Sequence, residues 1–164
     1  MPFKDKLYPD EASVLASNIA VLKKFPGSVS PASWLAFNDS ATRDAFWSLS
    51  ATDYTSGNVT VTILWGADTA TSGTVRWQAA IAAVTPETDA TDPSAKSYGT
   101  AVTVDDAHLG TTARRLMRAT LTLSGSSLDS LAQGDEVWLK ISRVGGNVAD
   151  NLSGDAWLNK VLVS

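Results

Sequence analysis

The feature that most constrains this chain is a two-residue alternation of apolar and polar side chains, which runs from about Trp47 to the C-terminus. Between residues 59 and 65 one face holds the apolar residues Val59, Val61, Ile63 and Trp65, and the two threonines of the stretch lie opposite. Because successive side chains of a strand point to opposite faces, this spacing predicts a half-buried β-strand. Residues 74–83 repeat the pattern, and we expect the two stretches to pair as a hairpin across the loop between them.

Further strands are predicted by the same alternation at four places, 101–104, 117–123, 137–141 and 156–163. Clusters of Gly, Asp, Ser and Pro separate them, and residues 84–99, with two prolines, indicate a long exposed loop. No helical segments alternate with the strands, which disfavours a parallel α/β sheet. About seven or eight short strands predict an all-β chain, specifically an antiparallel β-sandwich of jelly-roll type.

The first thirty residues have a different pattern. Pro9, Asp10 and Glu11 are typical of a helix start, and apolar residues follow at roughly helical spacing up to Lys24, namely Val14, Leu15, Ile19 and Leu22. Two interpretations are open: a short helix packed on the sandwich, or an arm that reaches a neighbouring subunit. We therefore expect residues 1–32 to form an N-terminal arm or short helix and residues 33–164 to form the sandwich domain.

Several classes of function are disfavoured by what the 164 residues contain. The absence of Cys excludes disulfides, thiolate metal sites and thiol catalysis. The chain has a single histidine, His108, and no Gly-x-Ser-x-Gly motif that would supply a nucleophilic serine for it to activate. Most aspartates lie in predicted turns, where hydrogen bonds to the backbone explain them, and Asp150 and Asp155 do not have EF-hand spacing. We expect no catalytic residues, no metal and no cofactor, and thus no enzyme.

Charge and hydropathy limit the partners. The net charge of −4 argues against a broad nucleic-acid-binding surface. No apolar run approaches the roughly 20 residues that cross a bilayer, and no secretory signal follows the charged N-terminus. The chain is expected to be a soluble protein made in a cytoplasm, with neither nucleic acid nor a membrane as partner.

Trp138 and a group of arginines are the surface residues that stand out. Trp138 is out of phase with Val137 and Leu139, so it is expected on the opposite face, where it would form a subunit contact or a sugar-stacking platform, or else belong to the core. The arginines near residue 115 could pair with acids across an interface or lie at a solvated strand edge. The predicted interface residues are Leu7, Tyr8, Leu15, Ile19, Leu22, Arg114, Arg115 and Trp138.

Four segments, as a set, resemble a family of small virion proteins of tailed bacteriophages. They are residues 65–77, 109–113 with the Arg-rich strand that follows, 134–143 with its Gly-Asp-x-Val-x-Leu-x-Ile-x-Arg pattern, and 149–156. The resemblance covers about residues 33–164. It implies a structural protein located in the virion, at the capsid surface, and assembled in the bacterial host cytoplasm.

Two functions follow as expectations. The first is a capsid decoration or cement protein, a homotrimer that stabilises the shell through contacts with the major capsid protein. The alternative is a tail- or fibre-associated module that binds host glycan through Trp138 and the loops after Gly66 and Val84. The fold alone does not choose between them.

Overall fold

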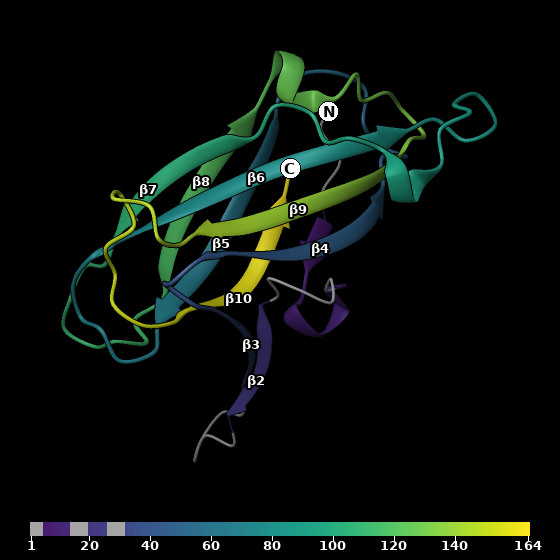
Figure 1. The fold of residues 1–164 in the computed structure, drawn as a ribbon. Helices are drawn as coiled ribbons and strands as arrows, with labels where there is room; N and C mark the ends of the chain where they lie inside the picture. Colours follow the sequence, from purple (N-terminus) through teal and green to yellow (C-terminus); the bar gives the residue numbers. More distant parts are fainter. Residues whose placement is uncertain (1–4, 14–19, 26–31) are drawn as a thin grey trace.

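The elements of the chain form two antiparallel sheets packed face to face (Figure 1). The computed structural model describes residues 5–13, 20–25 and 32–164. The strands there are β1 (Asp5–Leu7), β2 (Val21–Phe25), β3 (Ala32–Phe37), β4 (Thr42–Ser50), β5 (Val59–Ala67), β6 (Thr74–Val84), β7 (Val102–Ala107), β8 (Met117–Leu123), β9 (Glu136–Val144) and β10 (Ala156–Val163). Three short 3-10 helices lie between them, namely η1 (Pro9–Glu11), η2 (Pro93–Ala95) and η3 (Gly125–Leu128). The predicted antiparallel sandwich is confirmed.

The core lies between two sheets that we call sheet A and sheet B. Sheet A has the strand order β2-β3-β10-β5-β8, with β1 also paired to β10, and sheet B has the order β4-β9-β6-β7. The inward rows are buried as the alternation predicted, and the rings of Trp65 and Trp77, both fully buried, meet edge to face at 6.1 Å between centroids. None of the described helices is long and apolar enough to span a membrane.

The predicted hairpin between residues 59–65 and 74–83 is wrong. β5 pairs with β10 and β8 in sheet A, whereas β6 pairs with β9 and β7 in sheet B. Both strands bury their apolar rows in the same core, but from opposite sides. Alternation identifies the buried face of a strand and not its neighbour, and the loop at 68–73 is long enough to cross the roughly 10 Å between packed sheets.

The described N-terminal residues pack on this chain's own sandwich. β1 pairs with β10 of sheet A, Ser13 exchanges two backbone hydrogen bonds with Phe46 of β4 in sheet B, and β2 returns to sheet A beside β3. Of the expected helix, the described residues form the 3-10 turn η1 at its start and strand β2 at its end. Val14, Leu15 and Ile19 lie outside the described residues, and the boundary at residue 32 stays a prediction.

Candidate functional site

A groove of about 660 Å³ lies on the outer face of sheet B. Its floor comes from β4, β9 and β6, and its walls come from Ser13 on one side and from residues 92–98 on the other. The volume falls within the range of about 300–1,000 Å³ that is usual for small-molecule sites. The groove is therefore the main candidate site of the described chain.

Strand register explains why the floor is hollow. Trp138 of β9 lies between Ser48 of β4 and Ala82 of β6, and its ring is half-buried on the outer face, as its phase in the sequence predicted. Because both cross-strand neighbours are small, they leave room beside the indole ring. Phe46 follows on the same face, one row further along the sheet.

The far wall contributes a second large ring. Residues 85–101 connect β6 to β7, and Figure 1 shows this connection with η2 projecting beside the ends of β4 and β9. Its Tyr98 lies with its ring centroid 6.3 Å from that of Phe46, and the Nζ atom of Lys140 is 4.7 Å from the Tyr98 centroid. Tyr98 is thereby fixed over the outer face of β9.

Four contacts hold this wall in place. The Thr85 hydroxyl donates to Asp135 Oδ1 at 2.7 Å, and the Gly99 N–H donates to the Ile81 carbonyl at 2.9 Å. Asp129 Oδ2 accepts from the Ala83 N–H at 2.9 Å and pairs with Lys96 Nζ at 3.2 Å. A connection anchored at both ends and in the middle is a preformed wall, which lowers the entropic cost of binding a ligand.

The ionisable side chains among the described residues that line the groove are Asp92, Lys96 and Tyr98. Within the described chain, Asp92 is the one carboxylate among the lining residues, whereas a glycosidase usually needs two that flank the scissile bond. Hydrogen bonds from Ser94 hold the pKa of Asp92 below its ordinary value. Burial, and then the nearby Asp44 carboxylate, raise the pKa of the Tyr98 phenol, so this hydroxyl is a neutral donor at physiological pH.

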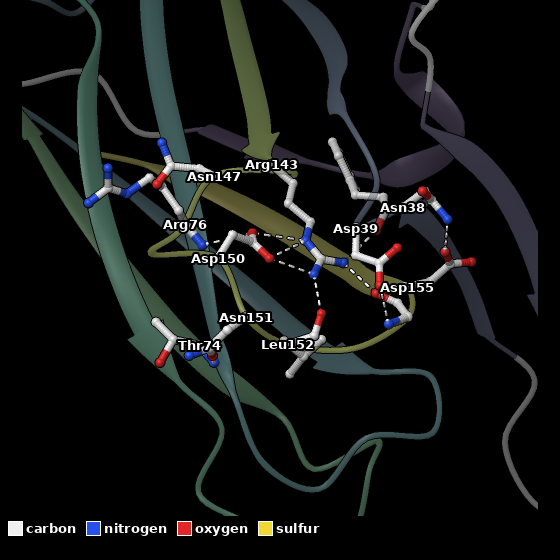
Figure 2. Close-up of polar contacts among 12 residues, drawn as sticks. Asn38, Asp39, Thr74, Arg76, Arg143, Asn147, Asp150, Asn151, Leu152 and Asp155 are labelled. Atoms are coloured by element: carbon white, nitrogen blue, oxygen red, sulfur yellow. Dashed lines mark hydrogen bonds and ion pairs between the residues drawn. The ribbon is translucent and has the colours of Figure 1, made fainter.

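A second polar cluster lies at the other end of β9 and faces inward. Figure 2 shows the guanidinium of Arg143 between the Asp150 carboxylate and backbone carbonyls of the β9–β10 loop. The Nη2 and Nε atoms of Arg143 donate to Asp150 at 2.7 and 3.0 Å, and further donations reach the carbonyls of Phe37, Leu152 and Gly154. Both side chains are fully buried.

This cluster has a structural role. Asp150 also accepts from the Arg76 N–H, and Asp155 accepts from Asn38, so these carboxylates are occupied by protein donors. In residues 5–13, 20–25 and 32–164 no group of three or more acidic or His side chains could hold a metal ion. The loop after Gly66 lies here, where Asn151 caps the Thr74 N–H, and so it is remote from Trp138.

His108 is held in a structural role as well. Its Nδ1 accepts from the Gly110 N–H at 3.0 Å, which leaves the proton on Nε2, and Nε2 donates to the Ala113 carbonyl at 2.9 Å. The ring is buried against Trp65, with 6.0 Å between centroids. His108 thus closes the turn between β7 and β8.

The predicted interface residues that the structure describes are spread over different parts of the molecule. Leu7 is buried in the core, whereas Leu22 on β2 is 39% exposed. The ring of Tyr8 is partly exposed, with Lys160 Nζ 4.9 Å from its centroid. Trp138 lies on the opposite sheet, and Leu15 and Ile19 lie outside the described residues.

The two arginines lie near the outer face of sheet A. Arg114 packs over the Trp157 ring at 4.8 Å and approaches Asp68 at 3.8 Å, while Arg115 donates to the Leu109 carbonyl. Their role in an interface stays a prediction.

Sequence reasoning found Trp138 and the loop after Val84, which the groove brings together, but it missed Phe46, Tyr98 and Lys140. A signal for Phe46 existed, since it is out of phase with the inward residues Ala45 and Trp47. No local pattern indicates that Tyr98 folds back over β9.

Comparison with known proteins gives matches of structure only. No protein-family model and no curated protein match the sequence. A family 35 carbohydrate-binding module from an environmental isolate matches with a TM-score of 0.58 and 13% identity, over 97% of this chain and 91% of that one. A family 35 module from Clostridium thermocellum gives 0.54 and 12% identity, over 98% and 97%. A third module, Xyl-CBM35 in complex with a glucuronic acid-containing disaccharide, gives 0.52 and 14%, over 97% and 91%.

These matches overturn the resemblance to virion proteins, and with it the predicted capsid role and virion location. Three solved structures that share this fold along nearly the whole chain are carbohydrate-binding modules and not phage proteins. The resemblance was misleading because a Gly-Asp turn followed by an alternating strand, as in residues 134–143, is common to sandwich domains in general and does not identify one family. At these identities the likeness establishes one thing: the chain has the sandwich fold found in carbohydrate-binding modules.

Proposed function

We propose that this chain is a carbohydrate-binding module that takes a glycan into the groove on sheet B. One observation carries the proposal: the rings of Trp138, Tyr98 and Phe46 gather around one open groove that is also bordered by serine hydroxyls. A sugar ring presents C–H groups on its faces and hydroxyls at its edge. Aromatic faces suit the former, and Ser48, Ser94 and Asp92 offer hydrogen-bond partners to the latter.

Two further observations support binding without catalysis. The similar structures carry names that describe binding modules, which is indirect support. The groove lining, as far as the chain is described, includes a single carboxylate. Since sandwich folds host many functions, the proposal depends on the groove and not on the fold.

Replacement of Trp138 tests the proposal. We expect the wild-type chain to bind at least one polysaccharide of a panel of xylan, mixed-linkage β-glucan, cellulose and galactomannan in affinity electrophoresis or calorimetry. Trp138→Ala should weaken that binding about 30-fold or more, the effect of losing a central aromatic contact of about 2 kcal/mol. Failure of the wild-type chain to bind any of these glycans would contradict the proposal.

A matched control is Trp34→Ala. Trp34 is a half-buried tryptophan on the outer face of sheet A, where it packs edge to face on Trp157 at 6.5 Å. Its removal deletes the same ring from the opposite side of the molecule and should leave glycan affinity unchanged. Thermal unfolding of both variants shows whether either change acts through the fold.

A further inference from the structure

The two large rings of the groove are held by different means. Trp138 is fixed by strand β9, whereas Tyr98 belongs to the connection between β6 and β7 and must be fixed by contacts. Lys140, two residues after Trp138 on the same face of β9, places its Nζ atom 4.7 Å from the Tyr98 ring centroid. This is the range of a cation–π contact. Lys140 is not among the side chains that line the groove, and it reaches the groove lining through its contact with Tyr98.

The other lysine of this region is occupied too. Lys96 Nζ pairs with Asp129 Oδ2 at 3.2 Å, and both side chains are mostly buried. The exposed carboxylate of Asp92 borders the groove, and hydrogen bonds from Ser94 favour its ionised form. An anionic sugar would therefore meet the charge of Asp92, while Lys96, which also lines the groove, is paired with Asp129, and Lys140 lies over the Tyr98 ring. Desolvation of its charge without a partner would be unfavourable.

We propose that Lys140 is a positioning residue that holds the Tyr98 ring as a second stacking surface beside Trp138, and that the groove consequently selects an uncharged saccharide chain of two or more residues. The inference rests on the proposed function and adds the ligand class and the residue that sets it. A single sugar can cover one ring, whereas a chain can cover both.

Two substitutions of Lys140 test the positioning role. The probes are xylohexaose and cellohexaose in titration calorimetry. Lys140→Met keeps an unbranched side chain, one atom shorter, but removes its charge, and should weaken binding of the preferred hexasaccharide about two- to fivefold, the effect of an exposed cation–π contact. Lys140→Arg keeps a cation over the ring and should restore wild-type affinity. Loss of affinity in both variants would overturn the role of the cation.

A double-mutant cycle shows whether Lys140 acts through Tyr98. Tyr98→Ala should weaken hexasaccharide binding, and in that background Lys140→Met should have no further effect, because the ring that it positions is gone. An additional loss in the double variant would mean that Lys140 touches the sugar itself, which would overturn the inference. Melting temperatures of all the variants report on any change in the fold.

The ligand class is tested with matched sugars on the wild-type chain. Xylose and glucose should bind at least about tenfold more weakly than the corresponding hexasaccharide, the order of one lost stacking contact. A xylo-oligosaccharide that carries a glucuronic acid should bind more weakly than its uncharged equivalent. Preference for the charged sugar, or equal affinity for the single sugar, overturns the inference and leaves the proposed function standing. Absence of binding to both hexasaccharides and to the polysaccharide panel overturns both.

Discussion

Arg143 is the residue on which the β9–β10 loop most depends. Its guanidinium is fully buried and donates to Asp150 and to the carbonyls of Phe37, Leu152 and Gly154. Arg143→Met would leave the Asp150 carboxylate buried without its cation. We expect a loss of about 3–5 kcal/mol in the free energy of unfolding, measured by urea denaturation.

The exposed Arg118 on β8 supplies the control for this prediction. Arg118→Met makes the same chemical change at the surface and should alter stability by no more than about 0.5 kcal/mol. In the double variant Arg143→Met/Asp150→Asn, part of the lost stability should return, because no uncompensated charge is buried. Equal stability of Arg143→Met and the wild type would contradict the role of the ion pair.

Asp106 gives the molecule a pH dependence. Burial raises the pKa of its carboxyl, against the hydrogen bond from Trp65 Nε1 at 2.6 Å, which lowers it. The folded state thus holds this proton more tightly than the unfolded chain, so stability falls as the pH rises from about 3.9 through the raised pKa. Asp106→Asn keeps an acceptor for Trp65 and should melt at a higher temperature than the wild type at neutral pH.

The same comparison at about pH 2.5, well below the pKa of the carboxyl in either state, should show no difference between Asp106→Asn and the wild type. Asp106→Leu is the matched control, since it removes the acceptor and leaves the buried Trp65 Nε1 unpaired at every pH. It should lower the melting temperature throughout. A stabilising effect of Asp106→Asn that persists in acid would contradict the assignment to ionisation.

For single residues, the sequence predicts the strand face on which a side chain lies better than it predicts which residues that side chain contacts. The phase of Trp138 against Val137 and Leu139 correctly placed its ring on the outer face of β9. The partners of Tyr98 could not be predicted, because Lys140 is 42 positions later and the contact depends on how a connection between two strands folds back. Local periodicity contains no information about such a contact.

At the scale of elements, strand positions were predictable and strand neighbours were not. The stretches 59–65 and 74–83 became β5 and β6 because alternation reports burial directly. Their pairing was mispredicted because short sequence separation favours a hairpin, whereas closure of the sandwich requires the chain to change sheets here. At the N-terminus, Leu22 has the spacing of a helix but lies in strand β2, because edge pairing with β3 overrides that spacing.

The connection between β6 and β7 depends on the small size of Gly99. A Cβ atom built there would lie 2.9 Å from the Ser126 carbonyl oxygen, so the loop must shift to accept a side chain. We expect Gly99→Ala to loosen the wall of the groove and to expose Lys96, which the wild type holds against Asp129. Trypsin should then cleave after Lys96 faster than in the native wild type, as located by mass spectrometry.

Ser97→Ala, an exposed substitution in the same connection, is the control and should leave the cleavage rate unchanged. Hexasaccharide affinity should fall in Gly99→Ala alone, because Tyr98 immediately precedes Gly99 in the chain. If Gly99→Ala is cleaved at the wild-type rate and binds the hexasaccharide with wild-type affinity, the expectation is wrong, and the connection accepts a Cβ atom at this position without loosening.

At the scale of the whole molecule, the N-terminal segment connects the two sheets. β1 buries Leu7 against sheet A, Trp47 Nε1 of β4 donates to the Tyr8 carbonyl at 2.9 Å, and Ser13 pairs with Phe46 at the edge of sheet B. Ser13 also borders the groove, so the segment couples the core to the candidate site. This connection predicts that the described N-terminal residues unfold together with the sandwich.

Leu7→Ala tests that coupling. Removing a buried leucine side chain should cost about 2–5 kcal/mol, and the whole unfolding transition, followed by tryptophan fluorescence, should move to lower temperature as one cooperative step. Leu109→Ala, at a leucine that is 66% exposed, should leave the transition where it is. If the N-terminal arm folds independently, Leu7→Ala should instead unfold in two transitions, with an earlier one for the arm and the main one at the wild-type temperature. The lost contact would then destabilise the arm alone.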